Sequence, residues 1–368
     1  MTDSSPPLSL LEIRLDAVCR NYLLLQKKLE RGCDLAAAVK ADAYGLGAHK
    51  VVPALYRAGC RHFYVAHAEE GIRARAVLPE DAGKAHVYVL HGTGGTDAEE
   101  FLRHDMTPVL NGFGDIENWA ALARRKEKKL PAVLQLDTGM NRLGLAADEI
   151  ARLCAVPDIL QPLDLRYVMS HLACADEPAH PKNRAQLEKF KRLTGALGLP
   201  CRLSLANSAG IFLGTDYHFD QARPGCALYG INPTPDAPNP MQGVITLKAR
   251  ILQIRDTAAG ETVGYGAAYA AARPVKLATI SVGYADGLLR SFGKNGMVYI
   301  GGCACPLTGR VSMDLVVADV TGVAAQAGDY AEIVGAHQTA DDVAAAAGTI
   351  GYEILTDLGR RYKRSYTG

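Results

Sequence analysis

The chain has 368 residues, of which 48% are hydrophobic and 21% are charged, and its formal net charge is +1. This length exceeds the size at which a single core usually stops growing, so we expect two domains. The balanced charge argues against a polyanion such as nucleic acid as a partner, and no apolar run approaches the length of a membrane span. The start, MTDSSPPLSL, lacks the basic and apolar regions of a signal peptide, which predicts a cytoplasmic protein with reduced cysteines.

The first two-thirds of the chain alternate short apolar runs with longer helical patterns. The early segment LEIRLDAVCRNYLLLQKKLE predicts a strand that leads into a helix, and stretches such as 115–126 and 183–197 have apolar residues at helical spacing. Eight strands are expected, at residues 35–39, 62–66, 86–90, 107–110, 131–136, 163–169, 201–205 and 226–229. Alternating strands and helices favour a parallel sheet, and eight such units over about 200 residues fit a (β/α)8 barrel. A doubly wound open sheet is the structural alternative.

The pattern changes at the Pro- and Asn-rich segment NPTPDAPNPM, which covers residues 232–241. After it, the segments ITLKARILQIRD, KLATISVGYADG, MVYIGG, LVVADV and YAEIVG predict short strands separated by turns, with one helix near 340–347. We therefore expect a barrel over residues 1–240 and a mainly β-strand domain over 241–368. The first strand, at about residues 10–16, is free to pair with the C-terminal domain.

Several chemically active side chains stand where the predicted barrel strands end. Active sites of this fold lie at the carboxyl ends of the strands, because the loops that follow them form one face. The residues in question are Lys40 after the first strand, Gln135, Asp137 and Arg142 after the fifth, His171 after the sixth, Asn207 and Ser208 after the seventh, and Arg223, Gly225 and Cys226 at the eighth.

Two of these positions suggest a cofactor with an aldehyde and a phosphate. Lys40 closes an apolar strand, and partial desolvation favours a free amine that can form a Schiff base; the alternative is a lysine that extends into solvent. Ser208 lies where a strand gives way to a helix, so its hydroxyl and the following N–H groups suit a phosphate, although an ordinary helix N-cap fits too. Gly225 would let the backbone approach the same anion.

A metal site is a competing interpretation of the segment that begins at His171. Cys174, Asp176 and His180 follow closely, but their spacing matches no known zinc site and no second ligand pair is present. We therefore predict no metal, and a metal-dependent barrel hydrolase remains an alternative from a different class.

Nine ordered segments between about Ala37 and Tyr352 closely resemble alanine racemase. They are AVKADAYGLG, LDTGMNRLG, SHLACAD, LANSAG, RPGCALYG, VGYGAAY, VGYADG, GRVSMD and TIGYE. The resemblance implies a (β/α)8 barrel followed by a β domain, pyridoxal phosphate (PLP) as cofactor, and interconversion of L-alanine and D-alanine. It also implies a homodimer with shared active sites and a role in supplying D-alanine for peptidoglycan.

The resemblance also assigns roles to individual residues. Lys40 would carry PLP as an internal aldimine, and Tyr265 would be the second acid–base group. His171 would stack on the pyridine ring and bond Arg223, which would face the ring nitrogen. The remaining assignments are Tyr44, Ser208, Gly225, Cys226 and Tyr352 for the phosphate, Arg142 and Met313 for the substrate carboxylate, and Tyr284, Arg290, Arg310 and Asp176 for the entrance.

Gln135 departs from the family pattern. The family commonly has a lysine seven residues before the arginine equivalent to Arg142, and that lysine can be carbamylated to an anion that orients the arginine. A glutamine cannot take up carbon dioxide and carries no charge, so its amide oxygen would accept a bond from Arg142 more weakly. This difference affects how firmly Arg142 is oriented, and it does not change the expected reaction.

The expected roles suit racemisation, which removes the α-proton from one face and returns it on the other. Two acid–base groups on opposite faces achieve this, with Lys40 on the D face and Tyr265 on the L face. A tyrosine with a reference pKa of about 10 needs cationic neighbours, for which we expect His171 and Arg223. The bulky Tyr284 and Tyr352 predict a small substrate. A broad-specificity racemase of the same fold and a PLP barrel decarboxylase are the alternatives.

Overall fold

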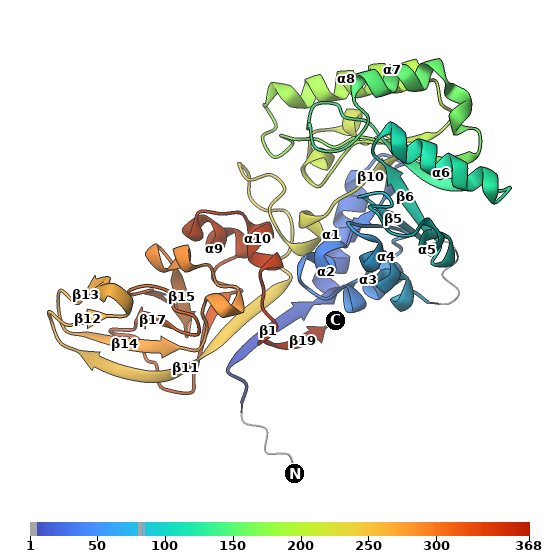
Figure 1. Cartoon of the computed structure of the whole chain (residues 1–368). Coiled ribbons are helices and arrows are strands. Elements are labelled where there is room, and N and C mark those ends of the chain that lie inside the picture. The colour runs from blue at the N-terminus through green and yellow to red at the C-terminus, as the bar shows by residue number, and fades with distance from the viewer. Residues whose placement is uncertain (1–5, 80–82, 84) are drawn as a thin grey trace, which may run out of the picture. The chain divides into compact units, whose positions relative to one another are not determined.

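The computed structural model describes residues 6–79, 83 and 85–368, which form two compact units (Figure 1). One unit, here called the barrel unit, contains Val18–Gln242. The other, called the strand-rich unit, joins residues 6–17 to Gly243–Gly368. No helix within the described ranges is long and apolar enough to cross a membrane.

The barrel unit is a closed parallel sheet. Its hydrogen-bonded order is β2-β10-β9-β8-β7-β6-β5-β4-β3, and each neighbouring pair is parallel. β2 and β3 are two pieces of one strand interrupted at Ala36, so the sheet closes on itself as a barrel of eight strands, which confirms the predicted fold. The strands are β2 Asp34–Leu35, β3 Ala37–Ala38, β4 His62–Val65, β5 His86–Val89, β6 Met106–Leu110, β7 Leu130–Gln135, β8 Leu163–Met169, β9 Arg202–Ser204 and β10 Gln221–Ala222.

Helix α1 follows strand β1 (Ser9–Arg14) of the strand-rich unit, whereas the later helices of the barrel unit follow barrel strands. In α6, Ile116, Trp119, Ala120 and Ala123 repeat at the three- and four-residue spacing that places side chains on one helix face, and all four are buried. The helices are α1 Leu15–Lys28, α2 Lys40–Tyr44, α3 Ala48–Arg57, α4 Ala68–Val77, α5 Ala98–Arg103, α6 Phe113–Arg125, α7 Ala147–Ala155 and α8 Pro181–Leu197, with 3₁₀ turns η1 Pro157–Leu160, η2 Ala209–Phe212, η3 Thr215–Tyr217 and η4 Cys226–Tyr229.

The eighth strand lies earlier than predicted. The expectation of a strand at residues 226–229 was wrong, because that segment forms the 3₁₀ turn η4, and the strand is β10 at Gln221–Ala222. Beyond Ala222 the chain still bonds the first strand, because the Pro224 carbonyl accepts a hydrogen bond from Ala38 N at 2.9 Å. All four residues of η4 are buried, which is why their apolar side chains gave the pattern of a buried strand.

Tyrosine side chains fill part of the barrel interior. Tyr64, Tyr88 and Tyr167 belong to its core cluster, and the rings of Tyr64 and Tyr88 stack with centroids 4.6 Å apart. A buried phenol needs a hydrogen-bond partner. The Tyr64 hydroxyl donates to Gln221 Oε1 at 2.6 Å, and the Tyr88 hydroxyl lies 3.1 Å from His62 Nδ1.

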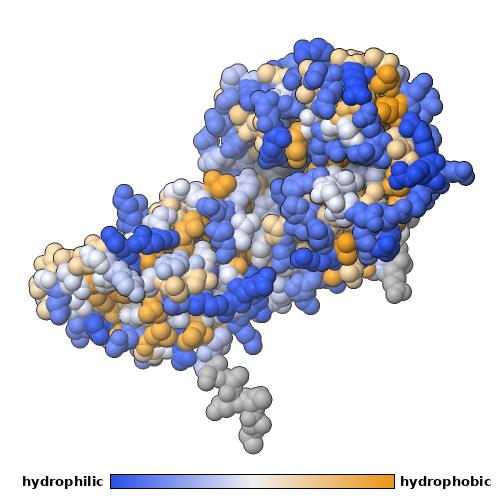
Figure 2. Space-filling view, in the orientation of Figure 1, coloured by the Kyte–Doolittle hydropathy of each residue, from blue (hydrophilic) through white to orange (hydrophobic). Residues whose placement is uncertain are grey.

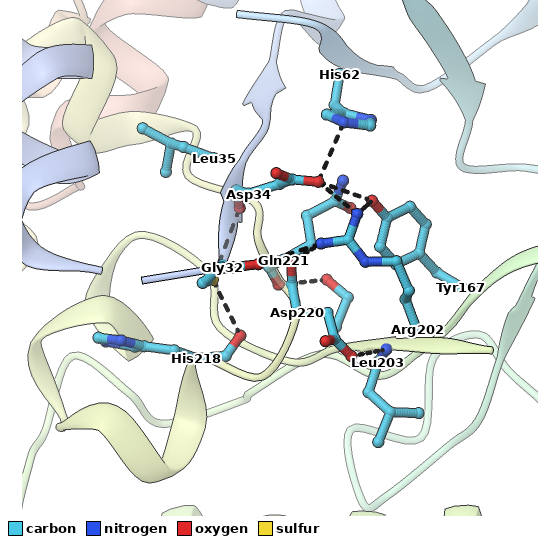
Figure 3. A network of polar contacts seen from close by, with 12 residues as sticks. Gly32, Asp34, Leu35, His62, Tyr167, Arg202, Leu203, His218, Asp220 and Gln221 are labelled. Atoms are coloured by element: carbon cyan, nitrogen blue, oxygen red, sulfur yellow. Dashed lines mark hydrogen bonds and ion pairs between the residues drawn. The ribbon is translucent and has the colours of Figure 1, made fainter. Parts of the chain in front are cut away.

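A polar network lies where the barrel strands begin (Figure 3). Asp34, at the start of β2, accepts hydrogen bonds from Arg202 at 2.6 Å and from the Tyr167 hydroxyl at 3.4 Å, and its carboxylate lies 3.5 Å from His62 Nε2. Hydrogen bonds from His62 and Arg202 outweigh burial and lower the pKa of Asp34 to about 2. The carboxylate therefore links strands β2, β4, β8 and β9 at the end of the barrel opposite the predicted site.

The strand-rich unit is built around the long strand β11. Ile245, Leu247, Ala249 and Ile251 alternate with less buried residues along β11, as expected for a strand with one face in a core. The main sheet runs β16-β15-β18-β11-β1-β19, with β14 between β11 and β17. Its elements are β1 Ser9–Arg14, β11 Ile245–Thr257, β14 Val275–Ile280, β15 Met297–Ile300, β16 Cys303–Pro306, β17 Val316–Asp319, β18 Tyr330–Val334 and β19 Lys363–Thr367, with β12 Thr262–Val263, β13 Tyr269–Ala270, η5 Tyr265–Ala267, η6 Tyr284–Asp286, η7 Arg290–Lys294, α9 Ala340–Ala347 and α10 Gly351–Thr356.

The first strand of the chain lies inside this sheet. β1 pairs antiparallel with β11 and parallel with β19, and its residues Leu11 and Ile13 are fully buried. Strand β1 thus lies beside a segment far away in the sequence, and Leu10 pairs with Lys363.

Candidate active site

The predicted site residues of the barrel unit gather at the carboxyl ends of the strands. Lys40 follows β3, Gln135 is the last residue of β7, and His171 follows β8. Ser208 follows β9, and Arg223 comes directly after β10. Because all barrel strands are parallel, these ends open on one face.

Lys40 begins an unusual turn of the backbone. The four residues after it, Ala41 to Tyr44, all have left-handed φ angles between 51° and 55°. L-residues other than glycine and asparagine rarely adopt this conformation, and each costs roughly 1–2 kcal/mol. Such strain persists only where surrounding contacts enforce it, and it tends to mark functional sites.

The amine of Lys40 is shielded from water. Burial lowers the pKa of Lys40, the positive charge of Arg142 lowers it further, and the carboxylate of Glu70 opposes both. The neutral amine is therefore favoured at a lower pH than for an exposed lysine, as addition to an aldehyde carbon requires. This agrees with the sequence interpretation of Lys40 and disfavours the alternative of a lysine extended into solvent.

Ser208, Gly225 and Tyr44 form a small group of donors that we call the phosphate cradle. The Ser208 hydroxyl, which is 5% exposed, accepts hydrogen bonds from Gly225 N at 2.9 Å and from Ala227 N at 3.3 Å. A Cβ atom at Gly225 would lie only 2.2 Å from the Tyr44 hydroxyl, so only glycine lets the backbone and this phenol approach so closely. A hydroxyl, a phenol and backbone amides are a donor set that fits a phosphate.

Arg223 is a buried cation beside the cradle. It is 5% exposed, and it donates to the Ser204 hydroxyl and to the Ser170 carbonyl. Within the described residues no carboxylate forms an ion pair with Arg223, so its charge is available to a bound group. The alternative of a surface ion pair is therefore wrong for Arg223. In the described part of the chain, the guanidinium of Arg223 forms its hydrogen bonds with Ser204 and Ser170 and none with the His171 ring, although the resemblance had implied one.

His171 is a neutral ring in this environment. Burial, together with the positive charges of Arg223, Arg142 and Lys40, lowers the pKa of His171 to about 3. Its backbone carbonyl is fixed by Gln186 Nε2 at 2.9 Å. Burial and the nearby positive charges therefore oppose a positive charge on His171, and Arg223 is the cationic member of the pair expected from the sequence.

Arg142 lies on a loop whose backbone is tightly fixed. Asp137 Oδ1 accepts hydrogen bonds from the N–H groups of Gly139, Met140 and Asn141 at 2.9–3.0 Å. Gln135 Nε2 donates to the carbonyl of Leu143 at 3.1 Å, and no bond from Arg142 to Gln135 occurs in the described structure. Gln135 therefore holds the residue next to Arg142 rather than Arg142 itself, in contrast to the contact considered from the sequence.

The segment considered for a metal is arranged differently. The Nδ1 atom of His180 accepts a hydrogen bond from Lys182 N and caps helix α8. The described residues contain no group of three or more His, Cys, Asp or Glu side chains placed to hold a metal ion. Asp176 is exposed in the loop before α8.

The other expected residues belong to the strand-rich unit. Tyr265 lies in η5 between β12 and β13 and is 73% exposed, so the alternative of a core aromatic is wrong. A Cβ atom at Gly266 would lie 3.1 Å from Arg310 Nη1, which places Arg310 beside the Tyr265 turn. Arg310 and Arg290 line a common pocket of about 430 Å³.

Three further expected residues have exposed side chains in the same unit. Met313 is exposed, and its carbonyl accepts a hydrogen bond from Ala285 N at 2.9 Å, next to Tyr284 of η6. Tyr352 lies in α10 and is partly exposed. The strand-rich unit thus presents on its surface the three expected tyrosines, Tyr265, Tyr284 and Tyr352, together with Met313 and two arginines.

Glu70 was missed by the sequence analysis. Its carboxylate accepts hydrogen bonds from Ala41 N at 2.7 Å and from Ala66 N at 2.8 Å, directly beside Lys40. The only signal in the sequence was an acid at the third position of a helix, where capping carboxylates are common.

Comparisons with known proteins identify the family of the chain. Models of protein families described as "Alanine racemase, N-terminal domain" and "Alanine racemase, C-terminal domain" match residues 13–233 and 244–366. An alanine racemase of Brucella canis is 46% identical over 97% of this chain and 93% of its own, and one of Rickettsia peacockii is 44% identical over 97% and 98%. A crystal structure of alanine racemase from Bartonella henselae with covalently bound pyridoxal phosphate matches with a TM-score of 0.94 and 42% identity, covering 98% of this chain and 100% of that one.

Proposed function

The chain belongs to the alanine racemase family, and from that premise we propose that Lys40 and Tyr265 are its two acid–base groups. The chain interconverts L-alanine and D-alanine with PLP as cofactor. The observation that carries this function is the combination, at one end of the barrel, of the desolvated Lys40 amine and the phosphate cradle.

The residues of the barrel unit fit PLP. Ser208, Gly225 and Tyr44 would hold its phosphate, with Cys226 and Tyr352 as further phosphate ligands, and Lys40 would bond its aldehyde carbon. Arg223 would face the pyridine nitrogen, and the neutral His171 would stack on the ring. When bound, PLP accepts the electron pair that remains at the α-carbon after proton removal.

Proton transfer is the task of Lys40 and Tyr265. A lysine amine whose pKa is lowered can accept a proton from the D face, and a phenol can serve the L face. Arg223 would place a positive charge near Tyr265. Burial lowers the pKa of Arg223, but a guanidinium keeps its proton in proteins. A ring nitrogen that faces this arginine stays unprotonated, which restrains side reactions at the cofactor.

Substrate binding is assigned to a small set of groups. Arg142, on the loop fixed by Asp137, and the backbone of Met313 would bind the substrate carboxylate. Tyr284, Arg290, Arg310 and Asp176 would form the entrance, and the bulk of Tyr284 and Tyr352 favours a side chain as small as that of alanine.

The proposal includes a homodimer with shared active sites in the cytoplasm, where D-alanine would be made for peptidoglycan. Eight of the eleven large apolar side chains that are exposed in the described chain belong to the strand-rich unit, Tyr265, Tyr284, Met313 and Tyr352 among them. Figure 2 shows apolar atoms among hydrophilic ones on one face of this unit. Exposed apolar surface of this kind favours contact with a second chain.

The function is tested by a racemisation assay across several L-amino acids with added PLP. We expect turnover of L-alanine above all others, loss of covalent PLP in Lys40→Ala, and retained PLP binding in Tyr265→Ala with a loss of about 10²–10⁴-fold in L-alanine turnover. Exchange of the α-proton from L-alanine in heavy water at an undiminished rate in Tyr265→Ala would reject Tyr265 as the base. Equal turnover of bulky amino acids would favour a broad-specificity racemase.

A further inference from the structure

We propose that Glu70 is a positioning residue for Lys40, because its carboxylate binds the backbone amide that directly follows Lys40 and so fixes the turn that carries the amine. This inference rests on the proposed function, since the position of Lys40 matters only if its amine holds the cofactor.

The two oxygens of Glu70 bind two neighbouring strand ends. Oε1 accepts the hydrogen bond from Ala41 N at 2.7 Å, and Oε2 accepts the one from Ala66 N at 2.8 Å. Ala41 lies just past β3 and Ala66 just past β4, and these strands pair in parallel. Glu70, on helix α4, therefore ties the end of the Lys40 strand to the adjacent strand through one rigid, charged group.

The alternative is that Glu70 only caps its own helix. In a capping box the carboxylate at the third helical position binds the amide of the N-cap residue. Here that amide is His67 N, and its distance to Oε2 is 3.5 Å, at the limit of a hydrogen bond. The two shorter hydrogen bonds of the Glu70 carboxylate go to Ala41 and Ala66, which lie outside helix α4. The strand ends are therefore the principal partners of Glu70.

The left-handed turn after Lys40 explains why such a group is needed. Ala41, Asp42, Ala43 and Tyr44 all hold positive φ angles that their side chains disfavour. Asp42 Oδ1 fixes the exit of the turn by accepting Ala48 N at 2.7 Å, and Glu70 fixes its entry at Ala41. Because hydrogen bonds hold both ends of the turn, the direction in which Lys40 leaves the barrel strand is fixed.

Glu70 also places a negative charge near Lys40. The groups that interact electrostatically with Lys40 are Arg142, Glu70, His91 and His171, and Glu70 is the only carboxylate among them in the described chain. It raises the pKa of Lys40 against burial and Arg142. Two substitutions change the site in different ways. Aspartate keeps the charge but is too short to span both amides, whereas glutamine keeps the length, removes the charge and can accept only one of the two amides because its Nε2 is a donor.

The test compares Glu70→Asp and Glu70→Gln with the control Glu69→Gln, which changes the exposed neighbouring carboxylate on the same helix. One measurement is hydrogen–deuterium exchange of the holoenzyme, resolved to the amide of Ala41. The other is the pH dependence of the rate at which added PLP is trapped on Lys40 by borohydride in PLP-depleted full-length protein. Thermal unfolding confirms that each variant is folded.

We expect exchange at Ala41 to be about tenfold faster in Glu70→Asp, as for a lost hydrogen bond, with a slower maximal trapping rate and an unchanged midpoint pH. In Glu70→Gln, the midpoint should fall by about half a unit to one unit, because the negative charge that raises the pKa of Lys40 is gone. Glu69→Gln should match the wild type in both measurements. Wild-type exchange at Ala41 and a wild-type trapping profile in both folded Glu70 variants would overturn the proposal. Failure of the wild type itself to be labelled at Lys40 would instead refute the proposed function.

Discussion

At the scale of single residues, the phosphate cradle depends on the absence of a side chain at Gly225. Gly225 gives Ser208 its amide hydrogen bond and leaves room for the Tyr44 hydroxyl, which would otherwise lie 2.2 Å from a Cβ atom. Tyr44 is itself buried and its ring stacks on Tyr229 with centroids 4.7 Å apart, so it has little freedom to move away. A side chain at this position must therefore distort the cradle.

We predict that Gly225→Ala weakens PLP binding by about 10- to 100-fold, since forcing a methyl group into a packed site costs roughly 1–3 kcal/mol. The measurement is a titration of the visible absorbance of the protein with PLP. Gly195→Ala is the matched control, because a Cβ atom at Gly195 in helix α8 meets nothing within 4 Å. Equal PLP affinity of the Gly225→Ala variant and the wild type would show that the cradle does not bind the phosphate.

The sequence predicted the positions of some site residues, but it did not predict their charges or their contacts. Lys40 and Ser208 could be placed at one barrel face, because each follows an apolar run that forms a strand, whereas Arg223 follows the short strand β10, which the sequence did not reveal. The protonation of His171 could not be predicted, because it depends on burial and on the nearby basic groups of Arg223, Arg142 and Lys40, which come together only in the folded barrel. The role of Glu70 was hidden for the same reason, since its partner Ala41 lies 29 residues away.

At the scale of elements, the beginnings of the barrel strands form a polar layer that has no part in the proposed reaction. Asp34, His62 and Arg202 connect strands there, and His86 at the start of β5 stacks on His62 with centroids 5.2 Å apart. Burial, followed by the nearby charges of His62 and Arg166, lowers the pKa of His86 to about 4. The folded barrel therefore holds this histidine in its neutral form over a range in which an exposed histidine is protonated.

We predict that the barrel loses stability as the pH falls from about 6.5, the pKa of an unfolded histidine, to about 4. Between these values the unfolded chain binds a proton at residue 86 that the folded chain does not, so the free energy of unfolding decreases with acidification. Urea denaturation at several pH values should show a shallower decrease in His86→Asn than in the wild type. The exposed His49→Asn serves as control, and an identical pH dependence in His86→Asn and the wild type would contradict the assignment.

The elements themselves were predictable where they are long and regular. Helix α8, strand β8 and the strands of the C-terminal part follow clear apolar periodicity. Strand β10 could not be recognised, because it has only two residues and is followed by the fully buried turn η4. The left-handed turn after Lys40 was equally invisible, since Ala41 and Ala43 carry no conformational signal in their side chains.

At the scale of the whole molecule, the proposed acid–base pair is divided between the two units of the chain. Lys40 belongs to the barrel unit and Tyr265 to the strand-rich unit, where it is 73% exposed. In the proposed homodimer each active site combines Lys40 of one subunit with Tyr265 of the other, which makes activity a property of the assembled pair.

We predict that inactive Lys40→Ala and Tyr265→Ala chains recover activity when mixed under conditions of subunit exchange. A heterodimer of this kind contains one site with both substitutions and one site with neither, so about half of the wild-type activity per heterodimer is expected on the two-fold symmetry of such dimers. Light scattering and mass spectrometry would establish that heterodimers have formed. Confirmed heterodimers without activity would show that the sites are not shared.

The pairing of strand β1 determines when its sheet can form during synthesis of the chain. Among the described strands, β1 at residues 9–14 is synthesised before all others, yet one of its two pairing partners, β19 at Lys363–Thr367, is synthesised after all others. The barrel unit can complete its sheet as soon as Ala222 has emerged, whereas the sheet around β1 must wait until β19 has been synthesised. During that interval the buried face of β1, with Leu11 and Ile13, is a natural binding segment for a chaperone that recognises extended apolar peptides.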